Sequence, residues 1–175
     1  MNILRKIIRE ILEEEDYTVY HGSPKEFDAF SLDFVGDGLD QHGPGFYFTS
    51  SYDNAFMYGN VKKYIVTIDK EPKLKGGINR EEIKKLMKWA PDLEDSLTNW
   101  AENPKIAFDK AFNAMINTDS QYNAFLNVWY DFYRNNTKQY LINISKLGYD
   151  GIILNQNQGI KYYIMFNPNK IKKVS

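Results

Sequence analysis

The hydrophobic pattern of this chain changes its period twice, and these changes constrain the fold more than any other feature. Between Tyr17 and about Asp69, runs rich in β-branched and aromatic residues are typical of half-buried strands. From Asn79 to Leu147, apolar residues recur every three or four positions, as in amphipathic helices. After Gly148 the strand-like pattern returns. This order predicts one α+β domain in which a mixed or antiparallel sheet is split by a helical block.

Strands are predicted on both sides of the helical block. The first region contains three strand-like runs and a short helix capped by Ser50 or Ser51: Thr18 to Tyr20, Gly45 to Thr49 and Val61 to Ile68, with the helix from Ser51 to Tyr58. The last region contains two runs joined by a turn-rich connection over 155–159: Ile152 to Leu154 and Tyr162 to Phe166.

Start signals divide the helical block into several helices. Capping residues precede the apolar stripes and predict helix starts at four places: Asn79, Asn103-Pro104, Asp119-Ser120 and Thr137. Gly148 is the predicted cap at the end of the block. Trp89, Trp100 and Trp129 all lie in this block, and we expect them to anchor its core because aromatic residues at helical spacing usually pack.

Residues 1–16 predict an amphipathic helix ahead of a domain that spans residues 17–175. Its apolar face comprises Ile3, Leu4, Ile7, Ile8, Ile11 and Leu12. The basic start and acidic end of this segment oppose the helix dipole, so packing must stabilise it. Packing on its own domain is the simpler interpretation, and docking on a partner or a membrane surface is the alternative.

Composition narrows the classes of partner and compartment. The chain has 22 basic and 23 acidic side chains and a net charge of −1, so no overall field attracts nucleic acid or an anionic membrane. It has no cysteine, which excludes disulfides and thiolate zinc sites. No apolar run is long enough to span a bilayer, and the start lacks the pattern of a signal peptide. We therefore expect a cytoplasmic protein.

The run Tyr20-His21-Gly22-Ser23 is the strongest candidate for a functional motif. A neutral histidine can donate or accept a hydrogen bond, which suits a ribose hydroxyl. The adjacent glycine lets a flat ligand approach the backbone, where an N–H and a C=O can pair with a carboxamide. A histidine beside glycine and serine is weak on its own, so the prediction of a site needs a second motif.

A glycine-hinged aromatic run, Gly43 to Thr49, supplies this second motif. Tyr47 lies on the predicted strand and Tyr58 lies eleven residues later, so both can face one cleft and sandwich a ring. Stacking of this kind is worth about 1–3 kcal/mol per ring. Together, the two motifs predict a nucleotide site.

These motifs resemble those of ADP-ribosyltransferases of the diphtheria-toxin and poly(ADP-ribose) polymerase type. The closest resemblance is to the domains found in polyvalent proteins of phages and mobile elements. The shared features are Tyr20 to Pro24, Phe27, Phe30, Gly36, Gly38, Ala55, Gly148 to Gly151, and Phe166 to Ile171. The resemblance covers both strand regions, and residues 79–147 look like an insertion peculiar to this chain.

The resemblance implies a mono-ADP-ribosyltransferase of the glycosyltransferase class that uses NAD as substrate and needs no metal. It also implies a separate role for each motif residue. His21 would hold the adenosine-side ribose, Gly22 would hold the carboxamide, and Ser23 would contact a ribose or the amide. Gly45 would lie in the binding strand. Tyr47 would stack on the nicotinamide, and Tyr58 would close the other side. The acceptor would be a protein rather than a nucleic acid, in the host cytoplasm or a phage particle.

One departure from the family pattern falls at Tyr162, which occupies the position of the usual catalytic glutamate. No acidic side chain lies between Gly151 and the C-terminus. Gln156 and Gln158 could supply only an amide, and the sequence leaves open a carboxylate from elsewhere, Glu71 or Glu102. The alternative function is therefore a silent nucleotide-binding or virion assembly module. RNA 2'-phosphotransferase chemistry is a poor third, because the four arginines lie away from the motifs: Arg5, Arg9, Arg80 and Arg134.

His42 is the second histidine and lies in the glycine-rich stretch Gly36 to Gly45. We expect an exposed side chain, with a position near the ligand as the alternative. A metal pair with His21 is disfavoured because no third ligand is evident.

Overall fold

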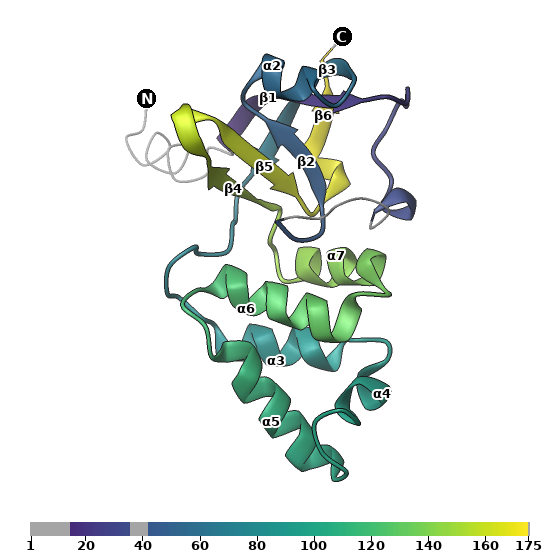
Figure 1. The fold of residues 1–175 in the computed structure, drawn as a ribbon, viewed down its shortest axis with the longest axis vertical. Helices are drawn as coiled ribbons and strands as arrows, with labels where there is room; N and C mark the ends of the chain where they lie inside the picture. Colours follow the sequence, from purple (N-terminus) through teal and green to yellow (C-terminus); the bar gives the residue numbers. More distant parts are fainter. Residues whose placement is uncertain (1–14, 36–41, 175) are drawn as a thin grey trace, which may run out of the picture.

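The computed structural model describes residues 15–35 and 42–174 (Figure 1). The predicted N-terminal helix lies outside the described residues apart from its last two positions. Glu15 and Asp16 belong to the first strand, where Asp16 pairs with Thr67 and accepts a hydrogen bond of 2.6 Å from the Thr67 hydroxyl. The predicted boundary after residue 16 is therefore two residues too late, because cross-strand pairing extends the strand toward the N-terminus.

Six strands form one sheet in which every neighbouring pair is antiparallel. The strands are β1 (Glu15–Ser23), β2 (Phe46–Thr49), β3 (Asn60–Ile68), β4 (Gly151–Asn155), β5 (Lys161–Met165) and β6 (Ile171–Lys173). They lie in the order β4-β5-β2-β1-β3-β6. The α+β class is confirmed, and the five predicted strands are present. The strand β6 was not predicted, because three residues that end in two lysines show no alternation.

The helices form a short segment after β2 and a block between β3 and β4. They are α2 (Tyr52–Phe56), α3 (Arg80–Lys88), α4 (Leu93–Leu97), α5 (Pro104–Ile116), α6 (Gln121–Val128), which continues as a π-helix over Trp129–Tyr133, and α7 (Thr137–Lys146). The helix α2 ends before Tyr58, which lies in the following turn. No helix among the described residues is long and apolar enough to cross a membrane.

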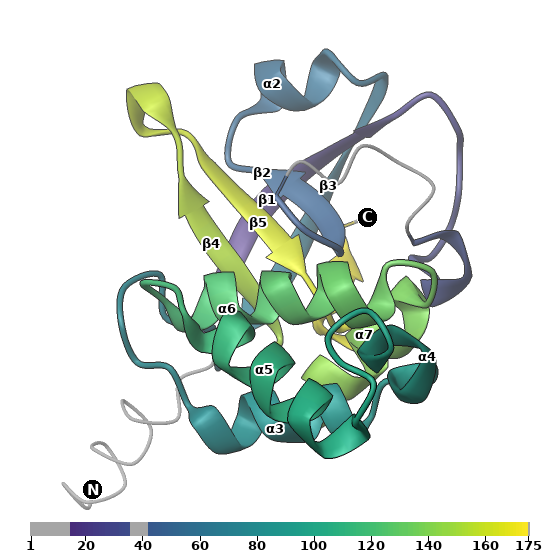
Figure 2. The same ribbon diagram turned by 60° about the horizontal axis from the view of Figure 1, so that its bottom comes forward.

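The sheet carries apolar side chains on both faces. Figures 1 and 2 show α3, α5, α6 and α7 gathered on one side and α2 at the opposite end. Ile152 and Ile164 pack into the core of the helical block. The neighbours of Ile164 on β5, Tyr163 and Met165, pack into a second core with Val19, as the two-residue period of a strand requires. Three predicted site residues, His21, Tyr47 and Tyr162, lie on strands β1, β2 and β5 of this sheet.

The tryptophans are not the core anchors that their helical spacing predicts. Trp89 follows α3 as its C-terminal cap and is 41% exposed, while Trp100 and Trp129 are only partly buried. Tyrosines fill the centre of the block instead. Tyr133 and Tyr140 are fully buried, and each hydroxyl donates to a backbone carbonyl, at 2.6 and 3.1 Å. A tyrosine suits such a position because its hydroxyl can reach a buried acceptor.

Candidate active site

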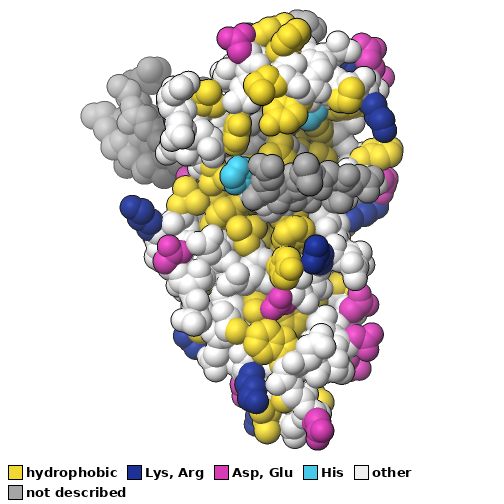
Figure 3. Space-filling view, in the orientation of Figure 1, with side chains coloured by type: hydrophobic (Ala, Val, Ile, Leu, Met, Phe, Trp, Pro, Cys, Tyr) yellow, Lys and Arg dark blue, Asp and Glu magenta, His cyan; other side chains and the backbone are white. Residues whose placement is uncertain are grey.

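A pocket of about 280 Å³ opens where β1 and β2 separate. Both histidines are visible on one face of the molecule, among hydrophobic side chains (Figure 3). The two strands share a single register pair, Tyr20 with Thr49, and beyond it they diverge. The walls of the pocket are formed by Tyr20, His21, Gly22, His42, Tyr47, Phe48, Thr49, Asn54, Ala55, Tyr58 and Tyr162.

The sheet register directs the backbone N–H and C=O of Gly22 toward this gap. The Lys63 carbonyl accepts from Val174 on the β6 side, so the backbone groups of Lys62 face β1. His21 is the partner of Lys62 and therefore directs its own backbone groups toward β3. The next residue, Gly22, faces the opposite way, toward β2, where the β1–β2 ladder has already ended. A ligand in the pocket thus meets a donor and an acceptor on one residue.

The His21 ring is fixed across the gap by a hydrogen bond of 2.8 Å between its Nδ1 and the Tyr47 carbonyl. A carbonyl only accepts, so Nδ1 carries the proton and Nε2 of the neutral ring is an acceptor. The ring lies among four aromatic side chains: Phe27, Phe30, Phe48 and Tyr64. Burial among them lowers the pKa of His21 below its usual value of 6.5, although the bond to Tyr47 partly opposes the shift. His21 is therefore a neutral, oriented hydrogen-bonding group.

The depressed pKa of His21 predicts how stability depends on pH. His21 binds a proton more readily in the unfolded chain than in the folded protein. The contribution of neutral His21 to the free energy of unfolding is therefore fully present above pH ~6.5 and falls as the pH drops below this value. This histidine adds a slope of at most about 1.4 kcal/mol per pH unit. Urea denaturation of wild type and His21→Gln between pH 5 and 8 should show the shallower dependence in the variant, with His42→Gln as the control. Parallel curves for wild type and His21→Gln would contradict the prediction.

The helical block reaches the pocket through Tyr122 on α6. The Tyr122 hydroxyl donates to the His42 carbonyl, and the His42 N–H donates to the Tyr47 hydroxyl at 3.3 Å. The Tyr47 hydroxyl in turn donates to the Gly43 carbonyl. Burial raises the pKa of Tyr122, so this hydroxyl stays a donor. The backbone of His42 and the outer end of Tyr47 are thus held in place by one helix.

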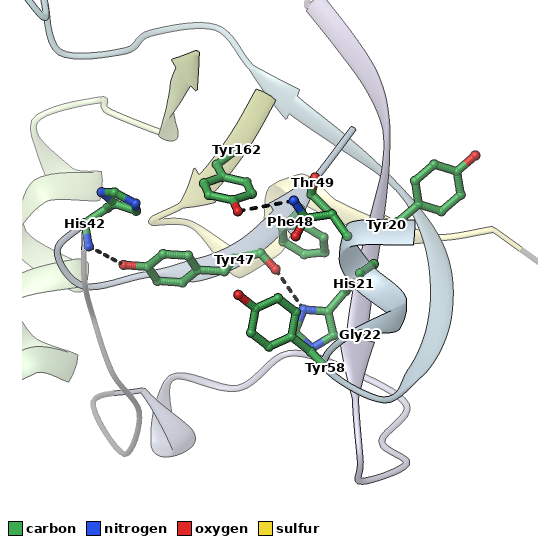
Figure 4. Close-up of a pocket in the computed structure, with 11 residues that line it drawn as sticks. Tyr20, His21, Gly22, His42, Tyr47, Phe48, Thr49, Tyr58 and Tyr162 are labelled. Atoms are coloured by element: carbon green, nitrogen blue, oxygen red, sulfur yellow. Dashed lines mark hydrogen bonds between the residues drawn. The ribbon is translucent and has the colours of Figure 1, made fainter. Parts of the chain in front are cut away.

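Three of the four tyrosines that line the pocket, Tyr47, Tyr58 and Tyr162, come from different elements. Figure 4 shows the rings of Tyr47, Tyr58 and Tyr162 around one space, with His21 beside it. Tyr162 is the second residue of β5 and pairs with Thr49, and its hydroxyl accepts a hydrogen bond of 3.3 Å from the Asn54 side chain. Its own hydroxyl proton remains a potential donor to a ligand.

Two residues of the predicted binding set, Ser23 and Gly45, do not line the pocket. The Ser23 hydroxyl accepts from the Lys25 N–H in a tight turn at the end of β1. Gly45 lies against β5, where a Cβ would come within 2.5 Å of the Ile164 side chain. Both residues therefore have structural environments of their own, and their proposed ligand contacts stay predictions.

The side chains offered as substitutes for a glutamate also lie elsewhere. The Glu71 carboxylate accepts from the Ile153 N–H at 3.1 Å and so holds the edge of β4. Glu102, Gln156 and Gln158 are likewise absent from the pocket walls. Among the described residues, no Asp, Glu, Lys or Arg lines this pocket. Across the described ranges, no three His, Cys, Asp or Glu side chains are grouped so as to hold a metal ion.

The sequence assigned no ligand contact to Thr49 or Asn54, and it predicted an exposed His42, with a position near the ligand as the alternative. Thr49 could have been found from the two-residue period, because it shares a face of β2 with Tyr47. Asn54 carries no such signal, since its position depends on how α2 packs on β1. His42 is partly buried and lines the pocket, with its ring 6.0 Å from that of Tyr162.

An antiparallel sheet with this pocket in its split is compatible with a domain of the ADP-ribosyltransferase class. The family described as "ADP-Ribosyltransferase in polyvalent proteins" matches residues 15–175, and the chain belongs to this family. The matched range includes residues 79–147. That this helical block is an insertion peculiar to the chain stays a prediction.

No curated protein matches the chain. Among solved structures it is similar to one titled "Crystal structure of an anti-CRISPR protein", with 11% identity, a TM-score of 0.38, and coverage of 91% of this chain and 96% of that one. A similarity at this level carries no argument about function.

Proposed function

We propose that the protein is an NAD-dependent mono-ADP-ribosyltransferase that transfers ADP-ribose to a protein acceptor, in the host cytoplasm or a phage particle. The observation that carries the proposal is the convergence of His21, Gly22, Tyr47 and Tyr58 on one pocket. These residues come from two motifs separated in the sequence, and the family to which the chain belongs is one of ADP-ribosyltransferases.

Each wall of the pocket suits one part of NAD. The N–H and C=O of Gly22 match the acceptor and donor of a carboxamide. Tyr47 and Tyr58 offer aromatic faces to the nicotinamide ring. The Nε2 atom of His21 is an acceptor for a ribose hydroxyl. At about 280 Å³ the pocket lies just below the usual range of about 300–1,000 Å³ for ligand sites, which suits the nicotinamide riboside half of NAD.

The proposed reaction depends more on how the site positions NAD than on acid–base catalysis. The bond between nicotinamide and C1' of the ribose breaks, positive charge develops on the ribose, and a nucleophile of the acceptor bonds to C1' and loses its proton. A neutral pocket that holds the ring and the ribose in a reactive posture contributes through orientation. The Tyr162 hydroxyl replaces the carboxylate with a neutral hydrogen-bond donor, so we propose single transfer without chain elongation.

Within residues 15–35 and 42–174, no acidic side chain lines the pocket, and this favours a second candidate function. Developing positive charge is stabilised best by a nearby negative group. Without one, the domain would bind the nucleotide and leave it intact, as a silent binding or assembly module. The two functions differ in one measurable event, the release of nicotinamide.

Nicotinamide release from NAD tests the proposal. We expect slow release by the purified wild type, at least tenfold less by His21→Ala, and faster release by Tyr162→Glu, because the carboxylate restores stabilisation of the charged ribose. The matched control is Tyr130→Phe, an exposed tyrosine outside the pocket. Release by Tyr162→Glu alone would support the silent module. Equal release by wild type and His21→Ala would refute the proposed site.

A further inference from the structure

The helix α2 and the turn after it expose an unusual concentration of large apolar side chains. Four of the nine large hydrophobic residues exposed in the described parts of the chain fall within residues 52–58. They are Tyr52 (54% exposed), Phe56 (66%), Met57 (80%) and Tyr58 (63%), which we call the α2 patch. In the space-filling view, hydrophobic side chains gather at the end of the molecule where α2 lies (Figure 3). Single exposed apolar residues are ordinary, but a contiguous group marks an interaction site.

The α2 patch is continuous with the wall of the pocket. Tyr20, a pocket residue, contacts Tyr52 edge-to-face with ring centroids 5.7 Å apart. The Tyr52 ring is nearly parallel to that of Phe56, at 15° and 6.5 Å. Tyr58 belongs to both the patch and the pocket. A row of aromatic rings therefore leads from the pocket outward over the surface of α2. A macromolecule whose reactive group enters the pocket from this side must contact these rings.

Charge selects the kind of macromolecule. None of the described residues that line the pocket is charged, and the only charged residue of α2 is Asp53, which is acidic. A nucleic acid needs cations along its phosphates, and this surface offers it an acidic side chain instead. A polypeptide with apolar side chains beside its modified residue can bury the exposed rings of the α2 patch, and apolar side chains are not repelled by the acidic Asp53.

The opposite side of α2 is fixed and unsuited to docking. Ala55 is 1% exposed, and its carbonyl packs against Gly22 of β1. Seating of this side on the sheet leaves Phe56 and Met57 pointing away from the protein core. The patch is therefore presented by a helix whose position relative to the pocket is set by direct packing.

We infer that the α2 patch docks the acceptor, and that this acceptor is a protein presenting apolar side chains next to the residue that receives ADP-ribose. The inference rests on the proposed NAD chemistry and adds to it the apolar character of the acceptor surface and the patch that selects it. Docking affects transfer to the protein and leaves the cleavage of NAD by water unchanged, because Phe56 and Met57 do not line the pocket.

The experiment separates these two activities. Wild type, Phe56→Ser/Met57→Ser and the control Ile106→Ser are each assayed for nicotinamide release without acceptor and for label transfer from NAD into bacterial and eukaryotic lysates. Ile106 is a matched control because it is 52% exposed and lies on α5, at the far end of the molecule from α2 (Figure 1). We expect the double variant to keep nicotinamide release within twofold of wild type and to lose at least tenfold of the protease-sensitive label. The control should keep both.

Each other outcome overturns the inference in a recognisable way. Undiminished protein labelling by the double variant shows that the patch does not dock the acceptor, and nuclease-sensitive label shows a nucleic acid acceptor. A wild type that sediments as a dimer, while the double variant sediments as a monomer, identifies a second copy as the occupant. Nicotinamide release with no labelled protein refutes the inference but leaves NAD cleavage standing. No release at all refutes the proposed function, and the inference falls with it.

Discussion

Gly22→Ala is expected to destabilise the protein by about 3 kcal/mol and to disrupt the pocket. An added Cβ at Gly22 would lie 1.8 Å from the Ala55 carbonyl oxygen and 2.8 Å from its carbonyl carbon. These are backbone atoms of α2, so no side-chain rotation relieves the clash. The helix must move outward and take Asn54, Ala55 and Tyr58 with it, all of which line the pocket. Urea denaturation and calorimetric titration with NAD measure the two effects.

A matched glycine separates the clash from the general cost of replacing glycine. Gly76 has a φ of +63° and no atom within 4 Å of an added Cβ, so Gly76→Ala should cost only about 1 kcal/mol of backbone strain. It should also leave NAD affinity unchanged, because it does not line the pocket. If Gly22→Ala costs no more than Gly76→Ala, then α2 is not held against β1 as the structure shows. Retained affinity in an unfolding-prone Gly22→Ala would limit the role of this glycine to packing.

Much of the fold could be predicted from the sequence because its signals are local. Asn79, Asn103 and Ser120 each accept backbone N–H groups at the start of a helix, as their capping chemistry predicts. Gly148 has a φ of +89° and follows Leu147, the C-cap of α7, as expected of a terminating glycine. The degree of burial was harder to predict. Trp89 has the apolar character of a core residue, but its place at the end of α3 leaves it exposed.

The candidate site was predictable only where a motif marked it. His21, Gly22, Tyr47, Tyr58 and Tyr162 were all singled out in the sequence, and all five line the pocket. The other walls result from tertiary geometry, because the pocket exists only where β1 and β2 diverge and α2 covers the gap. Thr49 and Asn54 enter through this geometry. The link from Tyr122 to His42 joins residues 80 positions apart, which no local pattern reveals.

Gly22 shows why a motif residue can have two explanations at once. The sequence motif assigns this glycine to close approach by a ligand. The structure adds a second requirement, because the Ala55 carbonyl already occupies the space where a side chain would lie. A glycine here is thus needed for the fold even before any ligand binds, so the motif alone does not establish catalysis.

Asp150→Ala is the second substitution with a large expected effect, about 2–4 kcal/mol of lost stability. Asp150 is 8% exposed, and its carboxylate accepts from the backbone N–H groups of Asp69 and Lys70, at 3.1 and 3.4 Å. Its own N–H donates to the Lys70 carbonyl at 3.0 Å. Asp150 therefore joins the segment that leaves β3 for the helical block to the segment that returns to β4. Alanine leaves two backbone donors without their acceptor.

Asp150→Asn distinguishes the loss of an acceptor from the loss of a charge. The amide oxygen can accept one or both N–H groups, so this variant should recover at least half of the stability lost in Asp150→Ala, as measured by urea denaturation. Equal losses in the two variants would show that the charge, rather than the acceptor, stabilises the junction. NAD affinity should change little in either variant, since Asp150 does not line the pocket. The run from Gly148 to Gly151 that supports the family resemblance therefore specifies the junction of sheet and helical block, whereas the proposed chemistry rests on the motifs at β1 and β2.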